Sequence, residues 1–169
     1  MTKYIKTFER QIVYSNKKFQ KILDFYLFCC PVPGTSVRGK SFYDYGWSGS
    51  SDFGKLKKQM LEASASETLK GRYFPCIKTD LEDRFNIVDS LEAPQEYCVF
   101  LKYDEQRVMQ SLYSAIRNAF AHGSFNVGTY KKVRIYYFEN FDGYMKAKIA
   151  LHEETLLAWI DIITKNTSK

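Results

Sequence analysis

The stretch "KKVRIYYFENFDGYMKAKIAL", residues 131–151, has a different periodicity from the sequence around it. Apolar or aromatic residues alternate there with basic or tyrosine residues, at Val133, Ile135, Tyr137, Met145, Ala147 and Ile149. This period of two is typical of half-buried strands. Asp142-Gly143 is a favoured turn pair between two strands. The sequence therefore predicts a β-hairpin, apolar on one face and basic on the other.

The basic face of this hairpin is a candidate surface for RNA. It is predicted to carry Lys132, Arg134, Lys146 and Lys148. Such side chains can contact phosphates, which gives affinity and salt dependence but no choice of sequence. The same charges also suit a strand face that is simply solvated, so both interpretations remain open.

The sequence on either side of the hairpin shows helical spacing. Helices are expected at residues 4–30, 52–69, about 80–90, 104–122 and 152–165. Residues 97–103 are apolar and fit either a strand or a helix. The resulting expectation is a mainly α fold, a bundle of four to five helices. The hairpin, about 131–151, would be inserted before the C-terminal helix of a single domain covering residues 1–169.

Two aromatic segments have an uncertain place in this fold. Residues 34–51 are expected to form a long loop whose rings, at Phe42, Tyr43, Tyr45 and Trp47, favour burial. The loop can be a lid, a dimer contact or a plain surface loop. Trp159 is expected in the core or in a dimer seam.

Composition sets further expectations. The net charge of +6 and a pI of about 9.0 weakly favour polyanionic partners. The four cysteines show no CxxC spacing, which indicates reduced thiols rather than a disulfide framework. The opening residues "MTKYIKTFER" have no apolar core, and no stretch is long enough to span a membrane. A cytoplasmic protein without membrane contact is therefore expected.

The segment "SAIRNAFAHGSF", residues 114–125, combines a helix end with three polar side chains. Gly123 stands where the glycine that ends a helix belongs. Arg117 and His122 are five residues apart, so an ideal helix places them about 140° apart around its axis. Asn118 and His122 share a face. The arginine must therefore reach around the helix, or meet a histidine from a second chain.

These residue types suit cleavage of RNA phosphodiesters. His122 can take the proton from a ribose 2′-hydroxyl, because histidine changes protonation near neutral pH. The planar guanidinium of Arg117 can neutralise charge on the phosphorane oxygens, and Asn118 can fix the histidine ring or contact the phosphate. No metal or cofactor is expected, because two histidines thirty residues apart, without HExxH or CxxC, make a poor metal site.

The pattern at residues 117–122 also resembles the signature of the HEPN superfamily, which is Arg, four to six residues, then His. "IRNAFAHGSF" matches in the spacing, in the polar residue after Arg117 and in the small residue after His122. The hairpin looks like insertions found in some members. The likeness covers about ten residues; beyond them it lies only in the expected helical architecture.

The resemblance implies a metal-independent endoribonuclease, usually a homodimer whose paired motifs face each other. Arg117 and His122 would be catalytic and Asn118 would support them. Such proteins commonly act as toxins or in abortive infection and other anti-phage defence, so an antitoxin or defence-system partner is implied. Ser124 departs from members whose tyrosine at this position is modified by a partner antitoxin.

Two other interpretations remain open. The chain can be a catalytically inactive HEPN-like module that binds RNA, a nucleotide or a protein partner. It can also be a helical interaction protein in which Arg117 and His122 are structural, since a histidine at a helix C-terminus stabilises it by ~0.3–1 kcal/mol.

Overall fold

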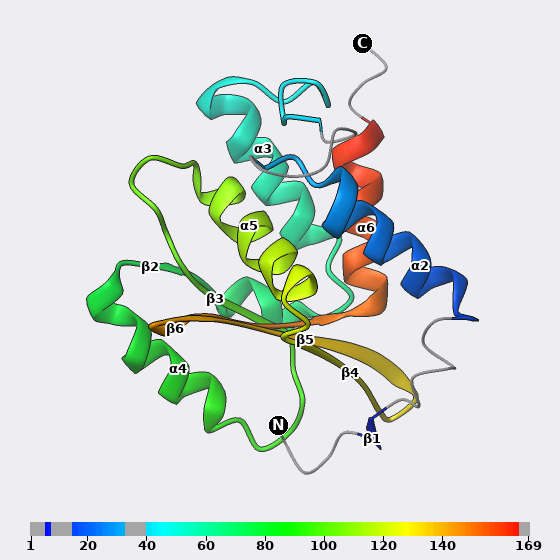
Figure 1. Ribbon diagram of the computed structural model, residues 1–169, viewed down its shortest axis with the longest axis vertical. Helices are drawn as coiled ribbons and strands as arrows, with labels where there is room; N and C mark the ends of the chain where they lie inside the picture. The colour runs from blue at the N-terminus through cyan, green and yellow to red at the C-terminus, as the bar shows by residue number, and fades with distance from the viewer. Residues whose placement is uncertain (1–5, 8–14, 33–39, 166–169) are drawn as a thin grey trace.

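The computed structural model describes residues 6–7, 15–32 and 40–165, and its centre is a mixed β-sheet (Figure 1). Six strands lie in the order β1-β4-β5-β6-β3-β2. Their bounds are β1 Lys6–Thr7, β2 Tyr73–Cys76, β3 Tyr97–Leu101, β4 Phe125–Tyr130, β5 Val133–Asp142 and β6 Tyr144–His152. Only β2 and β3 pair in parallel, and the other neighbours are antiparallel.

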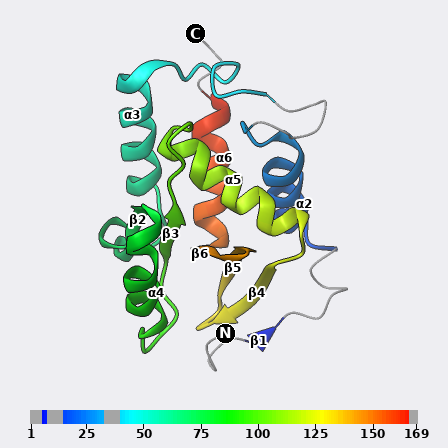
Figure 2. The same ribbon diagram turned by 60° about the vertical axis from the view of Figure 1, so that its left-hand side comes forward.

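The helices cover the two faces of this sheet unequally. They are α2 Lys17–Leu23 with its π-helical continuation Asp24–Cys29, α3 Gly49–Glu62, α4 Leu81–Asp89, α5 Val108–Ala121 and α6 Glu153–Lys165. Short 3-10 turns occupy Glu67–Gly71 and Lys78–Asp80. Figure 1 shows α2, α3, α5 and α6 on one side of the sheet and α4 on the other. Figure 2 shows α5 in front of α6, between α3 and α2.

The expectation of a mainly α bundle with a small inserted hairpin is therefore wrong, because the described fold is mixed α/β. The hairpin itself exists, as β5 and β6, with Gly143 at φ +71 in the turn. It stands inside the sheet rather than outside a bundle, because β4 pairs along β5 and β3 pairs along β6.

The side chains of β5 explain this central place. Tyr136 and Phe138 face the large core, and Phe138 packs edge-on against Phe120 of α5 with ring centroids 5.0 Å apart. Ile135 is also buried, at 1% exposure, although it points to the opposite face. A strand that buries apolar residues on both faces is typical of a sheet interior. The expected one-sided alternation overlooked this second buried face.

The N-terminal segment also differs from the expectation of one helix over residues 4–30. Lys6–Thr7 pairs with Gly128–Thr129 as a strand at the sheet edge, and residues 8–14 lie outside the described part. The helix then begins after Asn16, whose side-chain oxygen accepts a hydrogen bond from the Phe19 N–H at 3.0 Å. Its expected end before Pro31 is confirmed, since the helical residues end at Cys29.

The remaining expected elements agree in part. The helix expected at 52–69 is α3, and it ends earlier, at Glu62. The segment 97–103, which fitted either a strand or a helix, contains the strand β3, Tyr97–Leu101. The short helix expected near 80–90 is confirmed as α4. The helix expected from residue 104 is α5, which begins at Val108.

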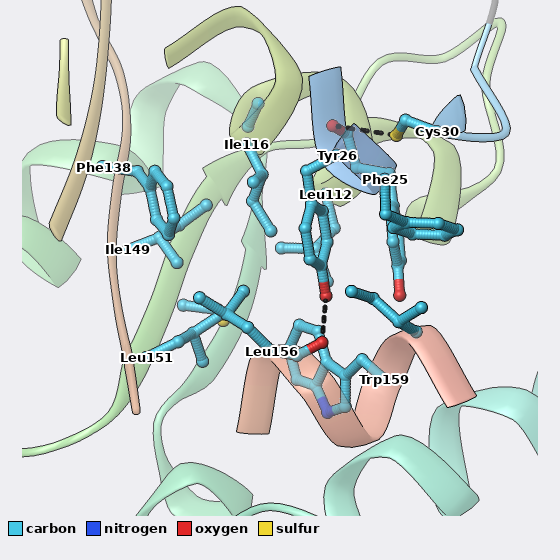
Figure 3. Packing of buried hydrophobic residues seen from close by; sticks show 14 of the residues in the cluster. Phe25, Tyr26, Cys30, Leu112, Ile116, Phe138, Ile149, Leu151, Leu156 and Trp159 are labelled. Atoms are coloured by element: carbon cyan, nitrogen blue, oxygen red, sulfur yellow. Dashed lines mark hydrogen bonds between the residues drawn. The ribbon is translucent and has the colours of Figure 1, made fainter. Parts of the chain in front are cut away.

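The large core lies between the sheet and the four helices. Trp159 of α6 is fully buried, and its indole N–H donates to the Met60 carbonyl at 2.9 Å. Tyr26 donates to the Leu156 carbonyl at 2.9 Å and stacks on Tyr113 (Figure 3). Both tyrosines are fully buried. Trp159 is thus a core residue of the single chain.

The aromatic loop contributes to the same core. Phe42, Tyr45 and Trp47 are buried, whereas Tyr43 is 74% exposed. The Trp47 indole N–H donates to the Ile163 carbonyl at 3.1 Å and thereby anchors the loop to α6. Residues 33–39 of this loop lie outside the described part.

A smaller core lies on the second face of the sheet, beneath α4. It is made of Cys76, Leu81, Phe85, Val88 and Val99. This patch covers the β2–β3 end of the face. The β4–β5 end has no such helix in the described residues, and the candidate site extends into that part.

Candidate functional site

The C-terminal end of α5 is shaped by a glycine motif. Gly123 has φ +68, a conformation that L side chains rarely adopt. Its N–H donates to the Phe120 carbonyl at 3.2 Å, and the Ser124 N–H donates to the Ala119 carbonyl at 2.8 Å. This pair of bonds is the Schellman ending, in which a glycine lets the chain turn away from the helix. The predicted role of Gly123 is confirmed.

Asn118 contacts both of the other polar residues at this helix end. Its side-chain oxygen accepts a hydrogen bond from Nη1 of Arg117 at 3.3 Å. Its main-chain carbonyl accepts the N–H of His122 at 3.0 Å. Arg117 and Asn118 are half-buried, whereas His122 is exposed. The structure thus places a held guanidinium and an accessible imidazole at one helix end.

The half-buried Arg117 lies close to Cys30, at the end of the N-terminal helix. Burial raises the pKa of the Cys30 thiol, and the positive charge of Arg117 acts in the opposite direction. Cys30 donates weakly to the Tyr113 carbonyl, with sulfur and oxygen 3.7 Å apart.

A cavity of about 680 Å³ begins where α5 ends. Gly123 and Ser124, which directly follow His122, line it together with parts of β3, β4, β5, β6 and α4. Its volume is within the range of small-molecule pockets. The Glu139 N–H donates to the Ser124 carbonyl at 3.0 Å, which attaches the helix end to the sheet beside the cavity. The two residues that directly follow His122 in the chain therefore line a hollow on the open part of the sheet.

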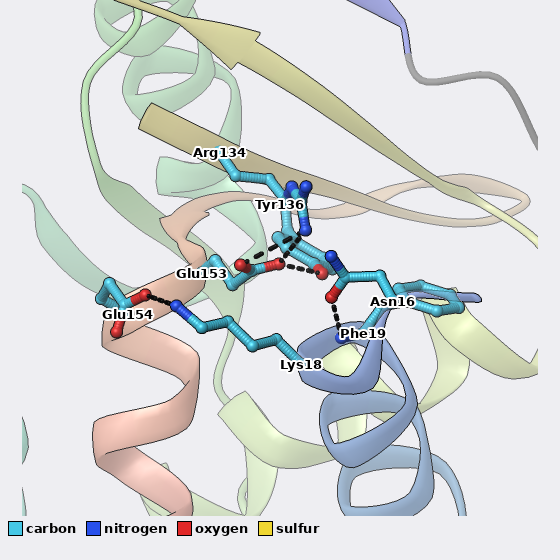
Figure 4. Close-up of polar contacts among 7 residues, drawn as sticks. All are labelled: Asn16, Lys18, Phe19, Arg134, Tyr136, Glu153 and Glu154. Atoms are coloured by element: carbon cyan, nitrogen blue, oxygen red, sulfur yellow. Dashed lines mark hydrogen bonds and ion pairs between the residues drawn. The ribbon is translucent and has the colours of Figure 1, made fainter. Parts of the chain in front are cut away.

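The four basic residues expected on one hairpin face do not share a surface. Arg134 points towards α6, where it pairs with the nearly buried Glu153 at 3.1 Å (Figure 4). Lys148 points to the opposite face and pairs with Asp89 of α4 at 2.7 Å. Lys146 also pairs with a carboxylate, Asp142, at 2.7 Å. Lys132 is exposed in the turn between β4 and β5.

The placement of Arg134 favours a structural role, which leads to a prediction. Glu153 accepts hydrogen bonds from Arg134 and from the Tyr136 hydroxyl, the latter at 2.8 Å. Arg134→Met removes the charged partner from a nearly buried carboxylate, so we expect the free energy of unfolding to fall by about 1–3 kcal/mol. Urea denaturation measures this, and the affinity for RNA should stay unchanged.

Two further variants make this prediction specific. Glu153→Gln in the Arg134→Met background removes the stranded charge and should restore part of the lost stability. Lys132→Met removes an exposed charge from the adjacent turn and should leave stability unchanged. A fall in RNA affinity without a fall in stability for Arg134→Met would contradict the structural role.

Sequence reasoning did not find the cavity, although Lys148, one of its lining residues, is a predicted RNA contact. The lining comes from five elements and the segments that join them, and its polar or aromatic members are Asp89, Gln95, Tyr97, Ser124, Phe125, Asn126, Tyr137, Glu139, Phe141 and Lys148. No local motif joins them, since cross-strand pairing brings them together. One signal was available: Phe141 is an apolar residue on a polar hairpin end, and it is 67% exposed.

The described residues offer neither a metal site nor a membrane-spanning helix. No group of three or more His, Cys, Asp or Glu side chains in the described part of the chain can hold a metal ion. Within the same residues, no helix has the length and apolar character needed to cross a membrane. Comparison of the chain with protein-family models, with curated proteins and with solved structures gave no match.

Proposed function

We propose that this chain is a metal-independent endoribonuclease and that the end of α5 is its active site. The observation that carries the proposal is the exposed His122 at the end of the helix that also carries the Arg117–Asn118 pair, directly before two residues that line the cavity. The resemblance of these ten residues to an RNA-cleaving signature supports the same chemistry. The proposal does not require the helical bundle that the resemblance implied.

Each of the three residues has a role in the proposed reaction. His122 accepts the proton of the ribose 2′-hydroxyl, whose oxygen then attacks phosphorus. Arg117 neutralises the charge that builds on the phosphoryl oxygens, and Asn118 holds the guanidinium in place. The bond to the 5′-oxygen breaks, and that oxygen takes the proton that His122 accepted. The products are a 2′,3′-cyclic phosphate and a 5′-hydroxyl end.

The proposal extends to assembly and biological role. Two copies would bring their α5 ends together as a homodimer, so that Arg117 of one copy can act with His122 of the other. Such an enzyme would act on RNA in the cytoplasm, as a toxin or an anti-phage defence effector, with an antitoxin or another defence component as a partner. Its net charge of +6 favours association with RNA.

The test is cleavage of labelled RNA by the purified protein in excess EDTA. We expect cleavage under these conditions, with cyclic phosphate and 5′-hydroxyl ends identified by mass spectrometry. Loss of cleavage on chelation, or products with 5′-phosphate ends, would contradict the proposed chemistry. RNA that is bound but never cut by the folded protein would instead favour the inactive binding module.

A further inference from the structure

The cavity on the open sheet face has a chemistry of its own, separate from the helix end. It adjoins the proposed active site in the chain, since Gly123 and Ser124, which line the cavity, directly follow His122. The role assigned to the cavity rests on the proposed cleavage of RNA and names the part of the RNA that the cavity takes.

The charges in the cavity wall disfavour a phosphate. Its charged residues are Asp89, Glu139 and Lys148, which leave one net negative charge. The ammonium group of Lys148 donates hydrogen bonds to both carboxylate oxygens of Asp89, at 2.7 and 3.0 Å. Glu139 lies directly opposite Lys148 in the strand register and is exposed. The cavity therefore presents a carboxylate to its occupant, and a carboxylate accepts hydrogen bonds from N–H donors.

Aromatic rings give the cavity flat apolar surfaces. Tyr97 and Tyr137 lie in one row across the sheet, separated by the small Ala150. Burial raises the pKa of the Tyr97 hydroxyl, and the nearby carboxylate of Glu139 raises it further. A shift of strand register between Asn140 and Phe141 interrupts the pairing, which resumes with Phe141 opposite Met145, and the Phe141 ring is 67% exposed at this point. Bulges are frequent beside active sites, where they redirect a side chain.

We propose that this cavity binds a guanine base of the RNA, next to the phosphodiester that is cut. The base stacks on the exposed Phe141 ring. The Glu139 carboxylate accepts hydrogen bonds from two neighbouring donors of guanine, its ring N1–H and its exocyclic amino group. Adenine, cytosine and uracil do not present two adjacent donors on this edge, so the carboxylate distinguishes guanine from them.

The experiment measures binding without cleavage. The His122→Ala protein is titrated with the 3′-monophosphates of guanosine, adenosine, cytidine and uridine, and each dissociation constant is measured by calorimetry. Guanosine 3′-monophosphate should bind about 10-fold or more tightly than the other three. Equal affinity for the four nucleotides would overturn the assignment.

Matched variants locate the preference in the cavity. Glu139→Gln should lose most of the guanosine preference, because an amide cannot accept both donors, whereas Glu67→Gln, an exposed control outside the cavity, should keep it. Phe141→Ala should weaken binding of all four nucleotides by about 10-fold, since every base stacks. Its control is Tyr43→Ala, which removes a similarly exposed ring away from the cavity. A preference that survives Glu139→Gln would overturn the proposed role of this carboxylate.

The two proposals fail in different ways. If wild-type protein cuts RNA but shows no guanosine preference in cleavage position or in nucleotide binding, the cavity assignment is wrong and the active site stands. If guanosine 3′-monophosphate binds as expected while RNA is never cut, the cavity assignment is supported and the endoribonuclease proposal is wrong.

Discussion

Replacing His122 by alanine should lower the rate of RNA cleavage by about 10²–10⁴-fold, because the proton acceptor for the 2′-hydroxyl is removed. The side chain is exposed at the helix end, so the melting temperature should change little. Arg117→Ala should lower the rate by about 10²–10³-fold through loss of the charge that neutralises the phosphoryl oxygens. Single-turnover cleavage of labelled RNA measures both effects.

Mixing the two inactive variants tests whether the site is shared between copies. In a mixed dimer of Arg117→Ala and His122→Ala, one of the two composite sites keeps both wild-type residues. A statistical mixture should therefore recover about a quarter of the wild-type activity. A site contained within one chain would recover none, since each chain would lack one essential group.

Arg117 needs a control, because it is half-buried beside Asn118 and Cys30. Arg117→Lys keeps the charge but loses the planar fork, so it should fold normally and stay far below wild-type activity. A circular dichroism melt separates loss of chemistry from loss of fold. If the His122→Ala protein cuts RNA at the wild-type rate, the α5 end is not the active site.

Sequence reasoning was strongest where a single local signal decides the structure. Gly123 ends α5 because a positive φ favours glycine, and Gly143 turns the hairpin for the same reason. Both positions could be predicted from one residue and its neighbours. The ends of α4 and of the N-terminal helix at Cys29 likewise follow from local helix-stop signals such as Pro31.

The sheet was missed because its evidence is not local. β2 contains Pro75 and has only β3 as its neighbour, so its four residues carry a weak strand signal. β4, "FNVGTY", contains a glycine and directly follows a helix. Local signals therefore place its residues in the connection between that helix and the hairpin. Pairing with β5 and β3 makes these segments strands, and sequence periodicity does not record which strands pair.

The prediction of a basic hairpin face was wrong for a related reason. Alternation predicts that neighbouring residues on a strand point to opposite faces, but it does not say what covers each face. Glu153 of α6 and Asp89 of α4 lie on opposite sides of the sheet. Glu153 pairs with Arg134 and Asp89 pairs with Lys148, and both basic residues are among the expected RNA contacts. Such tertiary partners lie far away in sequence and could not be read from the hairpin.

Raising the pH above about 10 should unfold this protein within roughly one pH unit, because its core is rich in buried tyrosines. Burial raises the pKa of six of them, Tyr26, Tyr45, Tyr73, Tyr97, Tyr113 and Tyr136. Burial also raises the pKa of the thiols of Cys30 and Cys98. At high pH these groups stay protonated in the folded chain and ionise in the unfolded chain. Their contribution to the free energy of unfolding is therefore complete below their ordinary pKa and is lost as the pH rises above it.

The size of the effect follows from proton linkage. The folded chain binds more protons than the unfolded one at high pH, so stability falls as pH rises. Each fully buried tyrosine contributes about 1.4 kcal/mol per pH unit above pH ~10, and each thiol does so above pH ~9. Together they lower the stability by at most about 14 kcal/mol at pH ~11, which is comparable with a stability of ~5–15 kcal/mol. Urea denaturation at a series of pH values should show stability nearly constant up to pH ~8 and falling steeply above pH ~10.

Two tyrosine variants distinguish this cause from general alkaline repulsion. Tyr113→Phe removes one buried hydroxyl, so stability should fall less steeply above pH ~10 than in the wild type. Tyr43→Phe alters a ring that is 74% exposed and lies outside the core, so the slope should not change. Absorbance of tyrosinate gives the independent check, because the buried tyrosines should ionise together with loss of the circular dichroism signal. If they ionise near their ordinary pKa while that signal persists, the core does not bury these hydroxyls as the structure has them.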